Sequence, residues 1–405
     1  MRPAPSRTTY RLAAVPLASF VLMGLFWGAW AALVPDIQAR TGASPPELGA
    51  ALLWAGVGAL PAMLLTGRLW RRFGRGLVTF TLLLFGLAAA LPAVAPDVVF
   101  LAAGLACVGA ASGALDVAMN SEISEIEEGT GRRLMFLAHA LFSLAVLLSS
   151  ITVGVLRGAG VEPLPVLGTV ALAFMLTVVV ALVSDRRLPA RPTSATTTTS
   201  TPGLATSIRR AVILLGVLCA AAFLLEDALM SWSALFLERE LGATPAIGGA
   251  GPGLFAGAMF IGRAAGQLLV RRFADRQLLV GSGLIAATGI MLAALAPAAE
   301  IALVGFFVAG AGVSIAAPTL FGRAGRLAGP GQRGAAVSTL TVFGYLGFVV
   351  GPPIVGVIAG ATDLQMSFVA LAGLALSLAL VSRLSISDAA IAPAVDEELP
   401  PVARA

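Results

Sequence analysis

Residues 12–35 read LAAVPLASFVLMGLFWGAWAALVP, a run in which no side chain carries a charge. An α-helix needs about 20 apolar residues to cross a hydrocarbon core about 30 Å thick. This run is long enough to do so, and similar runs recur along the whole chain. Read between charged residues, they cover 12–35, 48–67, 76–96, 98–115, 134–156, 163–184, 211–225, 241–262, 277–299, 301–322, 334–362 and 364–382. The sequence therefore predicts twelve transmembrane helices joined by short connections.

The composition of the 405-residue chain agrees with this interpretation. Hydrophobic residues make up 58% and charged residues only 12% of the chain, whereas soluble domains carry about 25% charged residues. Lipid cannot satisfy backbone polar groups, so a spanning segment must pair them internally, and helices are the default. We expect an all-α membrane protein with a multi-pass topology.

The basic residues are distributed unevenly between the two sides of the predicted helices. All 26 are arginine. With the N-terminus placed inside, only Arg40, Arg157 and Arg239 fall outside, and Arg263 lies within a span. Because an excess of Lys and Arg marks cytoplasmic segments, we expect both termini in the cytoplasm and the chain in the cytoplasmic (inner) membrane. The net charge of +5 then reflects topology and lipid contact, and we expect no nucleic-acid partner.

A polar, Thr-rich stretch divides the chain into two halves of six spans each. The stretch from Pro192 to Gly203 is low in complexity and has the composition of a flexible linker. The tail is rich in Pro, Ala and acidic residues, which favours disorder. The predicted parts are an N-terminal six-helix bundle at 1–184, a cytoplasmic linker at 185–210, a C-terminal six-helix bundle at 211–384 and a disordered cytoplasmic tail at 385–405.

The two halves repeat one short motif at the same topological position. Arg-Arg-Phe occurs at 71–73, after the second span, and again at 271–273, after the eighth. Two related halves that rock about a central site are a common transporter architecture. We therefore predict two pseudo-symmetric six-helix bundles.

The loop Gly67-Arg68-Leu69-Trp70-Arg71-Arg72-Phe73-Gly74-Arg75 resembles the signature of the major facilitator superfamily. Further segments are similar to the MosC-like (YbjJ-like) branch of that superfamily. They are Gly28–Ala32 with Pro35–Ile37, Leu48–Leu53, Ala114–Asn120, Gly131-Arg132 with Met135 and His139-Ala140, Trp232–Ala234, Gly262-Arg263, Gly344-Tyr345 and Gly351–Pro353. The resemblance implies the major facilitator fold and a secondary transporter that works by alternating access.

The chain departs from the pattern of these relatives at several charged positions. Arg71 stands where the superfamily signature has Asp, Ser231 where the branch often has Asp, and Leu33 where Arg is frequent. The ion or substrate roles that those charges would carry therefore do not transfer to this chain.

Ionisable side chains inside spans are costly and are candidates for function. Four of them are our candidates for proton coupling: Glu226, Asp227, Asp116 and His139. The seventh apolar run is short, so its helix must continue through Glu226 and Asp227, and one of the two is expected to face a cavity and carry a proton. The alternative is a hydrated carboxylate pair at the outer mouth.

Asp116 and Asn120 are four residues apart and share one helix face. Asp116 takes part in an inner gate or ion relay, or it pairs with Arg72 or Arg75 to hold the inner loops. His139, the single histidine, is either a proton carrier or a packed, hydrogen-bonded side chain.

Four residues are candidates for lining the substrate cavity: Trp30, Asn120, Arg263 and Tyr345. A buried arginine needs an anionic partner, which for Arg263 is either Asp116 or an anionic group on the solute. Trp30 and Tyr345 either line an apolar cavity or serve in packing and interface anchoring.

Charges of opposite sign fall in symmetry-related inner connections of the two halves. We predict that they attract across the cytoplasmic mouth and help to close it, although a solvated surface is the alternative. The gate candidates are Glu122, Glu125, Glu127 and Glu128 in one connection, Arg323, Arg326 and Arg333 in the other, and Arg71, Arg72 and Arg75 after the second span.

Several kinds of chemistry are excluded by the residues present. Without lysine the chain cannot form a Gly-x-x-x-x-Gly-Lys nucleotide loop, and one His with two Cys leaves no zinc cluster. We expect no cofactor, no enzymatic activity and a monomer.

The leading hypothesis is proton-coupled transport of a small solute, with export favoured. The alternative is a membrane sensor or assembly partner on a transporter-like scaffold.

Overall fold

The computed structural model describes residues 7–185, 204 and 206–386 of the chain. The described residues form helices only, and twelve segments among them are long and apolar enough to cross a membrane. The helices are α1 (Arg7–Thr41), α2 (Pro45–Phe73), α3 (Arg75–Ala88), α4 (Leu91–Val94), α5 (Val98–Thr130), α6 (Met135–Gly158), α7 (Pro163–Asp185), α8 (Thr206–Arg239), α9 (Pro245–Leu269), α10 (Asp275–Ala294), α11 (Ala299–Ala361) and α12 (Leu364–Ser385). The predicted fold class is confirmed.

Two spans do not coincide with a single helix. The third span joins α3 and the short α4 into the segment Arg75–Val94. The 63-residue α11 holds the tenth and eleventh spans, Ala299–Gly329 and Gly331–Ala361, which meet at Gly329. Gly329 has a φ of 68°, a conformation that a residue without a Cβ adopts freely. The chain can therefore reverse direction there without an intervening loop.

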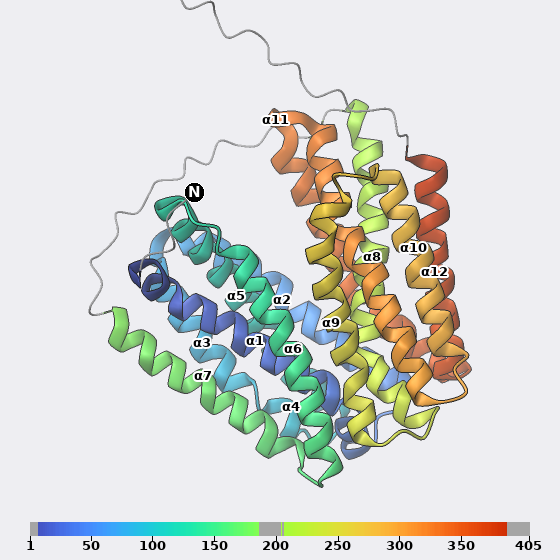
Figure 1. Ribbon diagram of the computed structural model, residues 1–405. Coiled ribbons are helices and arrows are strands. Elements are labelled where there is room, and N and C mark those ends of the chain that lie inside the picture. The colour runs from blue at the N-terminus through green and yellow to red at the C-terminus, as the bar shows by residue number, and fades with distance from the viewer. Residues whose placement is uncertain (1–6, 186–203, 205, 387–405) are drawn as a thin grey trace, which may run out of the picture.

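The helices form two bundles, α1–α7 and α8–α12, which we call the N-half and the C-half (Figure 1). We call the side at which α7 ends and α8 begins the linker end, and the opposite side the distal end. The ribbons of the two halves lie together at the distal end and separate towards the linker end (Figure 1). The linker at 186–203 and 205 and the tail at 387–405 lie outside the described residues.

Polar side chains at the distal end define where several helices begin. Asp97 accepts hydrogen bonds from the backbone N–H groups of Val99 and Phe100 at the start of α5. Asp363 does the same for Met366 at the start of α12. These carboxylates satisfy N–H groups that have no partner inside the helix. The short distal connections between spans are therefore set by local sequence.

The two halves meet through glycines at the distal end. A Cβ added to Gly249 of α9 would lie 2.7 Å from the Cα of Gly154 of α6. A Cβ added to Gly356 of α11 would lie 2.5 Å from the carbonyl oxygen of Pro45 of α2. Such distances are too short for any side chain, so the backbones are in direct contact, as small residues allow between membrane helices.

Glycines also hold helices together within each half. A Cβ on Gly109 would fall 1.9 Å from the carbonyl oxygen of Ala55, which joins α5 to α2. A Cβ on Gly347 would fall 2.1 Å from that of Ala220, which joins α11 to α8.

Three predicted boundaries change because the helices run beyond their apolar parts. α5 continues to Thr130, so Glu122, Glu125, Glu127 and Glu128 belong to its last turns and not to a loop. In the same way, Arg323 and Arg326 lie on α11. α8 begins at Thr206, inside the segment predicted as linker. An apolar run ends at its first charged residue, whereas a helix ends only where the backbone hydrogen bonds between successive turns end.

Candidate functional site

A central cavity of about 350 Å³ lies between the two halves. It is lined by residues of α1, α2, α5, α6, α8, α9 and α11. Its volume is at the lower end of the roughly 300–1,000 Å³ that ligand pockets occupy. The cavity can therefore hold one small molecule in contact with both halves.

Four ionisable side chains line this cavity: Asp116 of α5, Glu226 and Asp227 of α8, and Arg263 of α9. The Nη2 atom of Arg263 lies 3.0 Å from each carboxylate oxygen of Glu226. Of the two partners considered for Arg263, Asp116 is wrong, since the partner within the protein is Glu226, a residue of its own half. The hydrated outer mouth proposed as an alternative for Glu226 and Asp227 does not agree with their place in the central cavity.

Asp116 lies in the middle of α5 and is held by its neighbour one turn later. The side-chain amide of Asn120 donates to Asp116 Oδ1 at 3.0 Å and to the Asp116 carbonyl oxygen at 2.8 Å. The expected ion pair with Arg72 or Arg75 is absent among the described side chains. Arg75 instead pairs with Glu122 at 3.1 Å, because α5 continues past Asp116 and brings Glu122 to that level.

The other cavity candidates divide into two groups. Trp30 and Tyr345 line the cavity as expected. Asn120 acts on it only through Asp116. The His139 ring packs edge-on against Phe20, with 5.1 Å between ring centroids, and stands apart from the residues that line the cavity.

Sequence reasoning missed much of the cavity wall. Trp27 of α1 lines it and donates from Nε1 to Ser112 Oγ of α5 at 3.2 Å. Four methionines from four different helices complete the wall: Met23, Met63, Met230 and Met259. No spacing along the chain links residues of separate helices, so only the helical register of each span could have pointed to them.

Several of the gate candidates at the linker end have partners within their own half. In the N-half, Glu125 accepts from Trp70 Nε1 at 2.8 Å, and Glu127 accepts from the backbone N–H of Met135 at 2.9 Å. In the C-half, Arg323 and Arg326 lie 3.2 Å and 2.6 Å from Asp275. Arg72 lies over the ring of Phe73, Glu128 and Arg333 are exposed, and the Arg71 side chain is outside the described residues.

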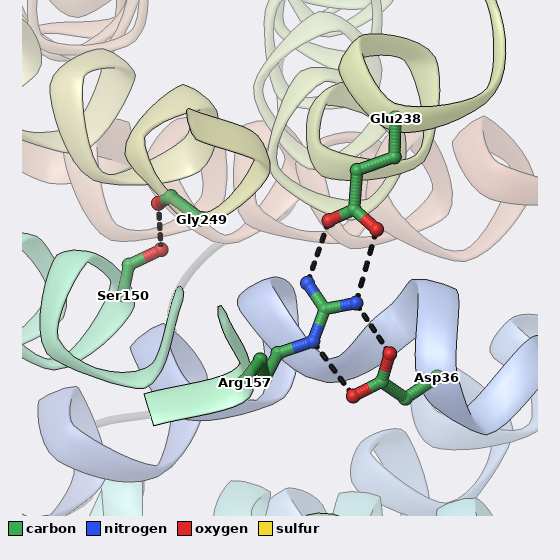
Figure 2. Close-up of polar contacts among 5 residues, drawn as sticks. All are labelled: Asp36, Ser150, Arg157, Glu238 and Gly249. Carbon is green, nitrogen blue, oxygen red and sulfur yellow. Dashed lines mark hydrogen bonds and ion pairs between the residues drawn. The ribbon is translucent and has the colours of Figure 1, made fainter. Parts of the chain in front are cut away.

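A cluster of three charged residues joins the halves at the distal end (Figure 2). Arg157 of α6 donates from Nε to Asp36 of α1 at 2.7 Å. From Nη1 and Nη2 it donates to Glu238 of α8 at 2.6 Å and 3.0 Å. Close by, Ser150 Oγ donates to the carbonyl oxygen of Gly249 at 2.7 Å (Figure 2). Arg157 thereby holds one carboxylate from each half.

The surroundings make this cluster strong. The Arg157 side chain is 1% exposed, Glu238 13% and Asp36 35%. A planar guanidinium suits two carboxylates that each bind it at two points. Removing one partner of a buried ion pair costs roughly 3–5 kcal/mol, because the other charge is left without compensation.

The sequence held a signal for this cluster that we did not use. Arg157 is one of three arginines in the predicted outer segments, and Asp36 and Glu238 end the spans that open each half. Three charges at the same depth, of which one is positive and two are negative, favour an ion-paired group.

The family model described as the Major Facilitator Superfamily matches residues 16–328 of the chain. An uncharacterised MFS-type transporter of Yersinia pestis is 32% identical over 367 residues, which cover 90% of this chain and 93% of that protein. The membrane protein MosC of Rhizobium meliloti is 29% identical over 346 residues, 85% of this chain and 83% of MosC.

Solved structures of transporters share the fold at low sequence identity. A crystal structure of a variant of the nucleoside transporter NupG superposes with a TM-score of 0.76 at 13% identity, covering 92% of this chain and 98% of NupG. A bacterial homologue of the human lysosomal transporter Spinster, in an inward-facing and occupied conformation, gives 0.74 at 16% identity, covering 94% and 97%.

Replacing Arg157 by Met should loosen the distal contact between the halves, since Asp36 and Glu238 then repel each other. The measurement is the rate at which a membrane-impermeant thiol reagent reacts with Cys placed at Ser150, in a chain with Cys107 and Cys219 replaced by Ser. We expect a rise of about tenfold or more, given the roughly 3–5 kcal/mol at stake.

Arg239→Met is the matched control for this experiment, because Arg239 is an exposed arginine at the same end of the molecule. It should leave the reaction rate unchanged. Equal rates in the Arg157→Met chain and in the parent would show that the cluster does not hold the distal end closed.

Proposed function

Because this chain belongs to the major facilitator superfamily and is a multi-pass membrane transporter, we propose that it moves a small solute across the cytoplasmic membrane by proton-coupled alternating access. The observation that carries the proposal is the central cavity, which both halves line and which contains three carboxylates and one arginine. We keep export as the direction to be tested first.

The contacts between the halves support alternating access. At the distal end the halves touch through the Gly154–Gly249 approach and through Arg157. At the linker end the charged side chains pair within one half, as Arg75 does with Glu122 and Arg326 with Asp275. In a second conformation the distal contacts between the halves would break, and the charged side chains of the two halves would approach each other at the linker end. The cavity would then open to the distal side.

Proton coupling rests on the carboxylates of the cavity. Asp116 and Asp227 have no ion pair among the described residues, while Glu226 has Arg263. An ionised carboxylate in a low-dielectric site is costly without a positive partner, and taking up a proton removes that cost. Asp227 and Asp116 are therefore the leading proton carriers. Glu226 and Arg263 act as a pair that changes when a proton or solute binds.

The distribution of arginine supports a cytoplasmic linker end. Nearly all arginines lie at the linker ends of the spans, whereas Arg40, Arg157 and Arg239 lie at the distal end. With this orientation the distal contacts close the outer side, and we assign the conformation to an inward-facing state. Both described ends of the chain, in α1 and α12, then lie on the cytoplasmic side.

Asp227→Asn and Asp116→Asn should each abolish or reduce by about tenfold or more the transport that a pH gradient drives, because an amide cannot carry the proton. Flux is measured in proteoliposomes, with and without a pH gradient, for a solute found by thermal-shift screening. Glu226→Gln, as a separate single variant, should also lower flux, because it leaves Arg263 unpaired.

Glu300→Gln provides the control, since Glu300 is exposed in the first turn of α11, away from the cavity. Gradient-driven flux that stays at the parental level in all three cavity variants would exclude coupling through these carboxylates. Binding of many solutes with no flux of any of them would instead favour a sensor.

The orientation can be read from fusions expressed in a bacterial host. A fluorescent protein attached after residue 405 should be fluorescent, and alkaline phosphatase at the same site should be inactive. The two reporters should behave in the opposite way when fused after Gly160, which lies in the distal connection between α6 and α7. The reverse pattern at both sites would place the linker end outside.

The acidic end of α5 and the basic part of α11 should attract each other when the linker end closes. Replacing both Glu125 and Glu128 by Gln should then favour the open state. Since each exposed pair is worth under about 1 kcal/mol, we expect a few-fold faster thiol labelling of Cys placed at Met63. The control is the pair Glu162→Gln and Glu300→Gln at the distal end. Labelling unchanged from that control would rule out the gate.

A further inference from the structure

We propose that the transported solute is a small organic cation with an aromatic or apolar body, whose charge is held by Asp116 and Asp227. This inference rests on the proposed transport function and names the class of solute. It follows from the charge balance of the cavity, from the place of the unpaired carboxylates and from the composition of the wall.

The cavity has more negative than positive groups. Asp116, Glu226 and Asp227 are acidic, and Arg263 is the one basic side chain among the described residues that line it. Both Glu226 oxygens already accept from Arg263. Asp116 and Asp227 remain without a positive partner, so a monocation would gain their attraction and an anion would meet repulsion.

The two unpaired carboxylates come from different halves. Asp116 belongs to α5 of the N-half and Asp227 to α8 of the C-half. Asn120 positions Asp116 by donating to its Oδ1, while Ser231 follows Asp227 by one turn on the same face of α8. A cation between them touches both halves at once, which is what a solute must do to bias the motion of one half against the other.

The wall of the cavity suits the rest of such a molecule. Trp27, Trp30 and Tyr345 line it, and the faces of aromatic rings attract cations at short distance. The four methionines add a polarisable surface that adapts to irregular apolar groups. Aromatic rings and thioethers do not replace the hydration shell of an inorganic cation, so this part of the wall favours an organic one.

Such a solute would compete with protons for the same carboxylates. Glu226 of α8, Arg263 of α9 and Tyr345 of α11 line the cavity together with Asp116 and Asp227. Outside the lining, His139 of α6 interacts electrostatically with Arg263, and Cys219 of α8 with Glu226. Arg263 stays charged at every pH of this range, whereas any charge that His139 gains as the pH falls opposes a cation. Protonation of the carboxylates acts in the same direction. Affinity for the cation should therefore fall as the pH is lowered.

Three probes of one shape test the charge of the ligand. Phenyltrimethylammonium, tert-butylbenzene and benzenesulfonate share a phenyl ring and a compact head, and carry charges of +1, 0 and −1. Binding to the purified full chain is measured by calorimetry and by fluorescence of the cavity tryptophans. We expect the cation to bind at least tenfold more tightly than the anion at pH 8, and to lose affinity at pH 5.5.

Amide variants locate the site. Asp116→Asn and Asp227→Asn should each weaken cation binding by roughly tenfold or more, the value of a hydrogen bond or contact to a charged group. They should reduce the difference between pH 8 and pH 5.5, and elution as a single species with an unchanged unfolding temperature shows that they are folded. Glu300→Gln should bind as the parent does.

The inference is overturned if the neutral or anionic probe binds as tightly as the cation. It is also overturned if both Asn variants bind the cation with the affinity of the parent chain. These outcomes differ from failure of the proposed function. A cation that binds as expected but shows no flux in proteoliposomes would refute transport and keep the ligand class. Flux of an anion driven by a pH gradient would keep transport and refute the ligand class.

Discussion

A charge cannot be left in hydrocarbon, and the rest of this structure depends on that constraint. Twelve spans bring few ionised groups into the membrane, and the structure places them where protein or cavity surrounds them. Arg157 lies between Asp36 and Glu238, and Arg263 lies against Glu226. Asp116 and Asp227 face the central cavity. Each of these costly groups therefore stands either at the contact between the two halves or at the cavity itself.

The contact at the distal end combines two kinds of interaction with different ranges. The approach of Gly154 and Gly249 depends on atoms in direct contact and is lost within a fraction of an ångström. The ion pairs of Arg157 act over a longer distance and are shielded from water by burial. In the proposed alternating-access cycle, together they would favour two discrete states, closed or open, over a range of partly open ones. A rigid-body change between two bundles needs this behaviour.

The central cavity differs from the distal contact, where Arg157 compensates the carboxylates. The carboxylates of the cavity are not fully compensated, and its wall includes several aromatic and sulfur-containing side chains. A carboxylate without a positive partner in such a site is stabilised when it binds a proton or a solute cation. Both would occupy the same atoms, so a single physical need can account for solute binding and for its coupling to protons. The Glu226–Arg263 pair lies beside these atoms and can respond to either occupant.

The sequence by itself determined the twelve spans, the division into halves and the identity of the ionisable residues inside the membrane. Hydropathy and charge are local properties, and the bilayer acts on each span separately. Only the tertiary structure decided the partners: Arg263 with Glu226, Arg75 with Glu122, and Arg157 with two halves at once. Such choices depend on how far α5 and α8 extend and on which face each helix turns to its neighbours. Those features arise from packing between residues far apart in the chain, which no pattern along one span contains.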